Sequence, residues 1–345
     1  DIKNLNRSCE GWISLIYLRL KKYAASGSKN LDNTEATSLM EQVVFDKLSP
    51  RKRNFLICNS VLDQFTKEQA KSMWNDAGDV EEILDSLVED NGFITRNQEG
   101  YYRYHAMLKA CALKHFEALD EEAKKDTYFR LGKWLESSKV YIEAEKYYEQ
   151  IGDYESLLDC IETDKGKGRG FDPTRVPLIY RWFGNCPKDI LKEHPYALIS
   201  FMLSFFVVHR FEEMHEVSDI LLDAIRENVK LSEEEKNNLY GEREMLLALM
   251  EFNDYTRMHV HQSRAMTLLT RTSQVINNDM PWTFGAVSAL QLYHRRPGEM
   301  RSELESIKEG LSVYAQLTDG HGSGGAALFE GEAAYMCGNM MDAEY

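Results

Sequence analysis

The sequence lacks a hydrophobic run long enough to cross a membrane. Its most apolar stretch, Tyr196 to Val208, has eleven apolar residues in thirteen, whereas a membrane-spanning helix needs about 20. This stretch indicates a helix that is buried on most sides by protein. The first residues show an amphipathic pattern, without the basic end and apolar run of a secretory signal. We therefore expect no membrane contact.

Cysteine and basic charge are both scarce. The six cysteines are scattered, with no CxxC pair and no His/Cys cluster at zinc spacing. This pattern predicts reduced thiols, a cytoplasmic location and no metal site. With 41 Lys and Arg residues against 56 Asp and Glu, the formal net charge is -15, which disfavours general attraction to nucleic acid or anionic membranes.

Catalytic and nucleotide-binding motifs are missing as well. The glycine-rich loop Lys165 to Gly170 does not have the GxxxxGK[ST] spacing of a phosphate-binding loop. A second cluster, Gly320 to Gly325, has no lysine and predicts a turn or a close approach of helices. Because no GxSxG or catalytic Cys/His signature is present either, we expect neither enzyme activity nor a bound cofactor in this chain.

Residues 48–118 show the pattern of a winged helix, with three helices followed by a hairpin of alternating residues from Phe93 to His105. Thr66 is the expected N-cap of the second helix. The third helix, in the position of a recognition helix, has an apolar stripe and no basic residue. Its acidic residues are Asp79, Glu81, Glu82, Asp85, Glu89 and Asp90. DNA-binding helices neutralise phosphates, so we predict no direct nucleic acid contact.

Beyond this module, residues 119–345 show helical periodicity throughout. Helix pairs such as the one ending at Gly152 have weak self-similarity of the tetratricopeptide kind, without a strict period. The predicted fold class is mainly α, with a winged-helix domain followed by a tetratricopeptide-like helical-repeat superhelix.

Two places are candidate sites. Arg103 and His105 end the hairpin and place a guanidinium beside a titratable imidazole, although both could simply be polar residues at a junction. Aromatic and cationic residues gather near residues 281–298, which suits a small organic effector but also fits packing between helices. The effector-binding candidates are Trp282, Phe284, His294 and Arg295.

Several segments, taken in order, resemble the large ATP-dependent transcriptional activators of the LuxR class of the maltose-regulon activator type, which are signal-transduction NTPases with numerous domains. The resemblance covers essentially the whole chain. It is carried by Glu10-Gly11-Trp12, by Tyr102 to Leu108, and by the segments RWFGNCPKDILKEHPYAL, PWTFGAVSALQLYHRRPGEM and TDGHGSGGAALFEGEAAYMCGNMMDAE.

The resemblance implies that residues 1–47 are the last helices of an ATPase core, with ATP or ADP bound upstream in an intact protein and a DNA-binding helix-turn-helix downstream. His105 would approach the nucleotide phosphates, with Arg103 as its neighbour. The chain would then be an excised, truncated segment that relays effector binding by the superhelix to the nucleotide-binding module, with self-association on activation. The effector could be a small molecule or a protein, and the alternative is a tetratricopeptide-like protein scaffold without small-molecule sensing.

Overall fold

The computed structural model describes residues 33–74, 80–91, 93–163, 175–276, 282 and 288–344, together with six isolated positions between residues 13 and 24. The chain divides into two compact units, Asp1–Ile151 and Gly152–Tyr345. The amphipathic segment at the start of the chain and the glycine-rich loop 165–170 lie outside the continuously described residues. In the described part, no helix is both long and apolar enough to span a membrane.

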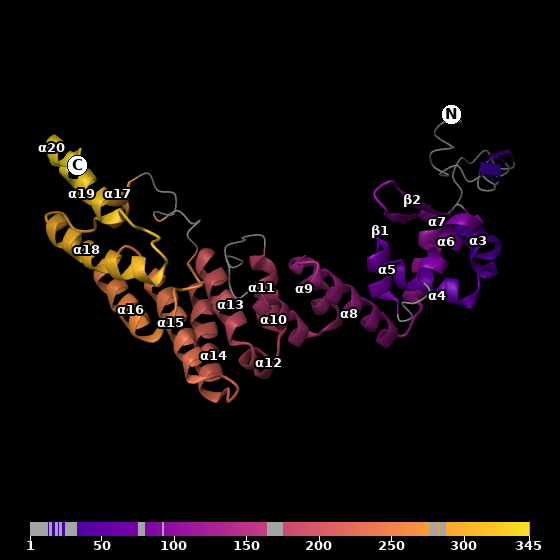
Figure 1. Cartoon of the computed structure of the whole chain (residues 1–345), viewed down its shortest axis with the longest axis horizontal. Helices are drawn as coiled ribbons and strands as arrows, with labels where there is room; N and C mark the ends of the chain where they lie inside the picture. Colours follow the sequence, from indigo (N-terminus) through magenta and orange to yellow (C-terminus); the bar gives the residue numbers. More distant parts are fainter. Residues whose placement is uncertain are drawn as a thin grey trace. The chain divides into compact units, whose positions relative to one another are not determined.

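The first unit contains the winged helix (Figure 1). Its strands form a three-stranded antiparallel sheet in the order β1-β3-β2, in which Phe65 pairs with Tyr102 and Ile94 pairs with Tyr104. The elements in chain order are α3 (Asn33–Val43), η1 (Phe45–Lys47), α4 (Pro50–Asn59), β1 (Gln64–Phe65), α5 (Lys67–Met73), α6 (Val80–Asn91), β2 (Ile94–Arg96), β3 (Tyr102–Tyr104) and α7 (Ala106–Glu117). The predicted hairpin is confirmed, and the short strand β1 is an addition that sequence analysis did not predict.

Local sequence explains where these elements begin and end. Ser49 caps α4 by accepting a hydrogen bond from the Lys52 amide, and Pro50 occupies the first turn, where no amide is needed. Thr66 caps α5 as predicted. Asn97 accepts hydrogen bonds from the amides of Glu99 and Tyr101, which stabilises the turn of the hairpin between β2 and β3. The capped helices surround one apolar core that includes Phe55, Leu84 and Tyr104.

Two further helices complete the first unit. These are α8 (Glu121–Ser137) and α9 (Tyr141–Ile151), which pack against each other as a hairpin. Their close approach requires a glycine, because a Cβ atom at Gly132 would lie 2.6 Å from Cε1 of Tyr148. Arg130 of α8 donates a hydrogen bond to the Met73 carbonyl. The hairpin is thereby joined to α5 of the winged helix.

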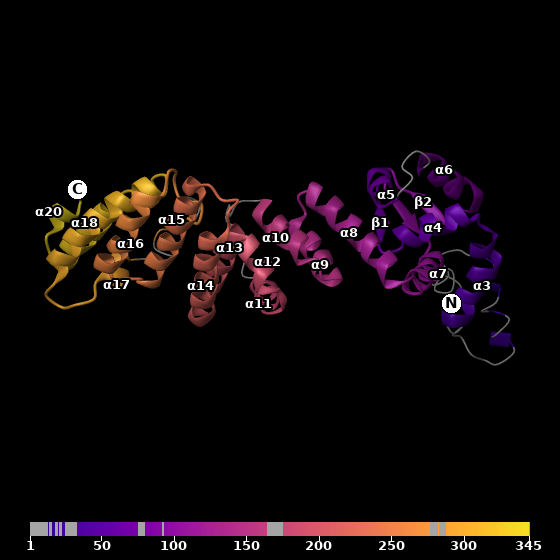
Figure 2. The same ribbon diagram turned by 90° about the horizontal axis from the view of Figure 1, so that it is seen from below.

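In the second unit, helices that are neighbours in sequence pack against each other as helical hairpins, such as α13 with α14 and α15 with α16. Figure 2 shows these hairpins side by side. Its helices are α10 (Tyr154–Thr163), α11 (Val176–Asn185), α12 (Lys188–Glu193), α13 (Pro195–Val207), α14 (Phe211–Glu227), α15 (Glu233–Met250), α16 (Tyr255–Leu268), α17 (Ala289–Tyr293), α18 (Met300–Leu317), α19 (Gly325–Met336) and α20 (Met340–Ala343). Helix α13 is buried over most of its length, as its apolar sequence predicted. The predicted fold class is confirmed.

Glutamates reach across helix boundaries and hold the repeats together. Glu162 of α10 accepts hydrogen bonds from the first amides of α13, at Tyr196 and Ala197. Glu332 of α19 does the same for the first amides of α17. A carboxylate at a helix N-terminus pairs with unsatisfied amides and with the positive end of the helix dipole. Each contact therefore stabilises the position of one helix relative to another.

Candidate functional site

His105 begins the last helix of the winged helix. It is the N-cap of α7, and its Nδ1 accepts a hydrogen bond from the Met107 amide at 3.3 Å. The neutral imidazole in this arrangement carries its proton on Nε2. Its ring also makes an edge contact with Phe93, with ring centroids 5.5 Å apart. His105 therefore has a structural role as a helix cap through Nδ1, and the hydrogen-bond donor of its ring is Nε2.

Arg103 lies on β3 between two buried tyrosines, with its own side chain exposed. Alternation along a strand places successive side chains on opposite faces, so Arg103 points away from the core. It pairs in register with Gln64 of β1 and Thr95 of β2. The structure thus keeps a charged group on the outer face of the wing sheet.

The outer face of α6 is acidic. The side chains of Glu81, Glu82, Asp85 and Glu89 are exposed, while Ile83, Leu84 and Leu87 are buried. Glu81 forms an ion pair with Lys67 at 2.6 Å. Asp79 lies outside the described residues. This surface presents negative charge where a DNA-reading winged helix needs positive charge.

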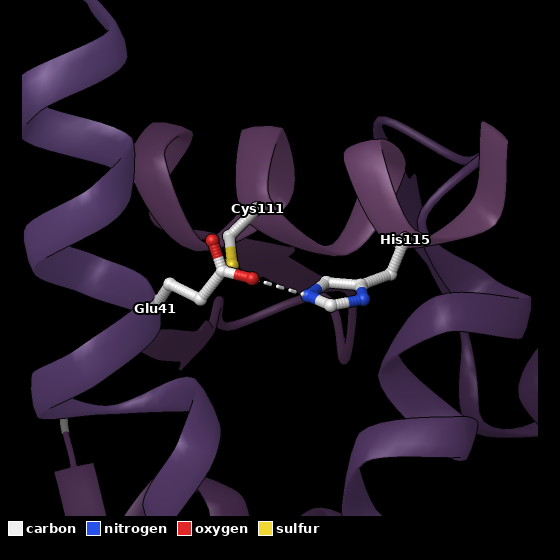
Figure 3. Close-up of side chains that lie close together, drawn as sticks. All are labelled: Glu41, Cys111 and His115. Atoms are coloured by element: carbon white, nitrogen blue, oxygen red, sulfur yellow. Dashed lines mark hydrogen bonds and ion pairs between the residues drawn. The ribbon is translucent and has the colours of Figure 1, made fainter. Parts of the chain in front are cut away.

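A polar cluster joins α3 to α7 (Figure 3). Oε1 of Glu41 lies 2.9 Å from Nε2 of His115, and Oε2 lies 2.8 Å from Nζ of Lys114. The hydrogen bond from Lys114 is the main reason that the pKa of Glu41 is lowered. Cys111 lies beside these groups, and burial raises the pKa of its thiol to about 11. The cluster connects the winged helix to the helix that precedes it.

In the second unit, Glu303 of α18 organises the turn that follows α17. It accepts hydrogen bonds from the backbone amides of Arg295 and Arg296, and its Oε2 lies 2.5 Å from Nδ1 of His294. The Arg295 guanidinium also pairs with Asp254 at 2.8 Å. Two predicted effector candidates, His294 and Arg295, are therefore tied to one carboxylate.

The ring of Trp282 packs against two glycines, Gly322 and Gly325. A Cβ atom at Gly322 would lie 2.6 Å from Cδ1 of Trp282, and one at Gly325 would lie 2.8 Å from Cη2. Gly320, Gly322 and Gly324 all have positive φ. The first of the two predicted alternatives for this cluster, a turn, is confirmed. Trp282 also packs on Tyr293, with ring centroids 5.4 Å apart.

A polar pocket of about 380 Å³ opens between α16, the turn after α17 and α18. Three arginines, Arg257, Arg295 and Arg296, line it together with Ser302 and Ser306. Tyr255 and Tyr293 add aromatic surface, and burial raises the pKa of Tyr293 to about 12, so that it stays a neutral phenol at physiological pH.

A second hollow, more apolar and about 850 Å³, lies between α17, α19 and α20. It is lined by His294 but not by Arg295, with Leu290, Leu328 and Tyr335 among the apolar residues. The structure thus places His294 and Arg295 at different pockets, and Trp282 lines neither. Phe284 lies outside the described residues. The effector role of these residues stays a prediction.

Sequence analysis missed two groupings of possible ligand atoms. One is Glu41 with Cys111 and His115, and the other is Asp159 with Glu162 and His194. The available signals were a Cys and a His four residues apart, and an Asp and a Glu three residues apart, spacings that share a helix face. The third member of each group comes from a distant segment, so its proximity depends on tertiary packing.

Comparison with known proteins agrees with this geometry for the first unit. The family model for the MalT winged helix domain matches residues 40–124. This part of the chain is similar to the MalT winged helix domain. The match begins within α3 and continues into the first turn of α8, so the matched residues include Glu41, Cys111 and His115. The boundaries predicted at 47/48 and 118/119 stay predictions.

Among solved structures, the chain is similar to a signal transduction ATPase with numerous domains and a tetratricopeptide repeat sensor from Pyrococcus horikoshii. The identity is 17% and the TM-score is 0.41, covering 98% of this chain and 50% of that chain. The present chain thus spans about half the length of that protein. No curated protein matches the sequence.

Proposed function

We propose that this chain is the regulatory, effector-sensing segment of an ATP-dependent transcription regulator. The MalT-type winged helix at residues 40–124, whose outer α6 face is acidic, supports a role in relay rather than in DNA reading. The helical repeats would bind the effector, and the winged helix would pass the change to a nucleotide-binding module in the same protein. ATP or ADP and any ATPase activity would belong to that module.

The effector site that we propose is the pocket between α16 and α18. Its three arginines can pair with an anionic group, while its serines supply further hydrogen-bonding groups. Their present partners are carboxylates, namely Asp254 for Arg295 and Glu299 for Arg296. Exposed ion pairs of this kind are weak, so an anionic ligand can replace them at low cost. The ligand class is a small polar metabolite with at least one anionic group.

A thermal-shift screen of anionic metabolites on the full chain tests this site. A ligand that binds only the folded state raises the unfolding midpoint, and this shift should be lost in Arg295→Ala. Arg226→Ala is the matched control, because Arg226 is also an exposed arginine that pairs with a nearby carboxylate. A midpoint shift that survives Arg295→Ala would refute the assignment.

The second candidate function is a protein scaffold without small-molecule sensing. The apolar hollow lined by Leu290, Leu328 and Tyr335 favours it, because such surfaces accept amphipathic segments. Peptide binding that is lost in Leu328→Asp, together with no metabolite response, would support the scaffold over the sensor.

For the relay, we propose that His105 and Arg103 contact the nucleotide phosphates or their immediate surroundings in the intact protein. His105→Asn keeps an N-cap residue while removing the imidazole. It should change the ADP dissociation rate of the intact protein without changing the stability of the winged helix. An unchanged dissociation rate would leave His105 with its capping role alone.

A further inference from the structure

Three potential ligand atoms converge where the end of α10 meets the start of α13. Nδ1 of His194 lies 3.5 Å from Oδ1 of Asp159 and 3.6 Å from Oε2 of Glu162. All three atoms lie within 4.8 Å of one another. Asp159 and Glu162 come from α10, and His194 is the residue immediately before α13. The group therefore bridges two helices that belong to different hairpins.

The hydrogen-bonding state of His194 is unusual. The residue is only 8% exposed, and its Nδ1 is buried without a hydrogen-bond partner. Distances of 3.5 and 3.6 Å to the two carboxylates are too long for good hydrogen bonds. A buried polar atom without a hydrogen-bond partner destabilises the fold, so this arrangement calls for a group that binds Nδ1 of His194.

The spacing matches the coordination sphere of a small metal ion. Nitrogen and oxygen ligands lie about 2.0–2.2 Å from zinc, and two such ligands in a tetrahedral arrangement are about 3.3–3.6 Å apart. The two separations between His194 and the carboxylates, 3.5 and 3.6 Å, agree with this value. The two carboxylate oxygens lie within 4.8 Å of each other, so a small adjustment of the side chains would let one ion bind all three atoms, and the fourth position would remain for water.

The surroundings favour a cation. Glu155 is a third carboxylate whose charge acts on His194. The other oxygen of Glu162 accepts hydrogen bonds from the amides of Tyr196 and Ala197, which fixes the orientation of that carboxylate. Asp159 is largely exposed and provides a route for entry from solvent.

The cluster of Glu41, Cys111 and His115 is a weaker candidate. There Glu41 already accepts a hydrogen bond from Lys114 and contacts His115 at 2.9 Å. A cation would have to displace the Lys114 ammonium and remove the proton of a buried thiol, both of which cost free energy.

We propose that Asp159, Glu162 and His194 bind one divalent transition-metal ion of the zinc class and thereby tie α10 to the start of α13. Binding requires the folded arrangement of both helices. The ion should therefore stabilise the second unit, whichever effector the repeats recognise.

Isothermal titration of the chelator-treated full chain with zinc chloride tests the proposal, together with the unfolding midpoint measured with and without zinc. One zinc ion per chain should bind, and the midpoint should rise. Asp159→Asn should weaken binding by at least about tenfold. This variant changes an exposed side chain and should fold normally. His194→Gln should abolish binding, with circular dichroism as the check of its folding.

Two controls locate the site. Asp219→Asn changes an exposed acid on α14 and should leave zinc binding unchanged. Cys111→Ser should also leave it unchanged. If zinc binding is lost in Cys111→Ser but kept in Asp159→Asn, the ion belongs to the other cluster and the proposal is wrong. It is equally wrong if the wild-type chain binds zinc no better than His194→Gln does, since the carboxylates then hold only a proton on His194.

Discussion

At the scale of single residues, several side chains in the candidate sites have structural roles through contacts with backbone amides or glycines. His105 caps a helix, Glu303 caps a turn, and Trp282 rests on two glycines. Each of these side chains also belongs to a region for which a binding role is proposed or predicted. Variants must therefore separate the structural contribution of a residue from its contribution to binding.

Gly325→Ala should destabilise the second unit by about 1–3 kcal/mol, because the added methyl group would overpack against the Trp282 ring. Chemical denaturation followed by circular dichroism measures this change in the free energy of unfolding. Gly331→Ala is the matched control in the same helix, since its Cβ would meet only the Ala343 carbonyl at 3.7 Å. That substitution should be neutral or stabilising by up to about 1 kcal/mol. Equal effects of the two variants would contradict the close packing of Trp282 against Gly325.

At the scale of elements, the turn after α17 depends on the ionisation of Glu303. Burial of this carboxyl group by itself raises its pKa. The hydrogen bonds from His294 and from the amides of Arg295 and Arg296 outweigh burial, so the net pKa is lowered from 4.5. A carboxyl group with a lowered pKa in the folded state stabilises the fold at pH values above its unfolded pKa.

The stabilisation from Glu303 should therefore be complete at neutral pH and be lost as the pH falls below about 4.5 through the folded-state pKa. Glu303→Gln removes the titrating group, so its free energy of unfolding should decline less between pH 6 and pH 3, within roughly the range in which acid-linked losses occur. Denaturation curves at a series of pH values measure the difference. Parallel curves for the wild-type chain and the variant would show that the carboxylate does not stabilise the turn.

At the scale of the whole molecule, charge sets which partners the chain can meet. The net charge is -15, and the exposed side of α6 carries four described acidic residues. A polyanion would be repelled by these charges, so it could bind only through specific contacts that outweigh the repulsion. The second unit nevertheless contains a pocket lined by three arginines.

We predict that the full chain does not bind duplex DNA at low ionic strength, because the described exposed side chains of α6 include Glu81, Glu82, Asp85 and Glu89, which repel phosphates. Fluorescence anisotropy of a labelled duplex at about 50 mM salt measures this, within the range where electrostatic binding is strong. A variant in which Glu82, Asp85 and Glu89 are replaced by lysine should gain weak, salt-sensitive binding. Tight DNA binding by the wild-type chain that weakens steeply with salt would overturn the relay interpretation of this domain.

Periodicity in the sequence was sufficient for the fold class, because helices and hairpins bury one face and leave the other in water. It predicted a helix pair that ends at Gly152, the residue that follows α9 (Tyr141–Ile151) in the structure, and it predicted the winged helix. It did not find β1, which is two residues long and exists because Gln64 and Phe65 pair with β3. A strand this short has no period of its own.

The sequence by itself determined which surfaces are apolar, where helices are capped, and that α6 presents acid rather than base. Tertiary structure alone decided which distant polar groups meet. Only packing places His194 beside Asp159, separates His294 from Arg295 into different pockets, and seats Trp282 on Gly322 and Gly325. The reason is physical: caps and amphipathic faces arise from neighbours within one or two helical turns, whereas sites arise from contacts between helices whose spacing is set by the whole core.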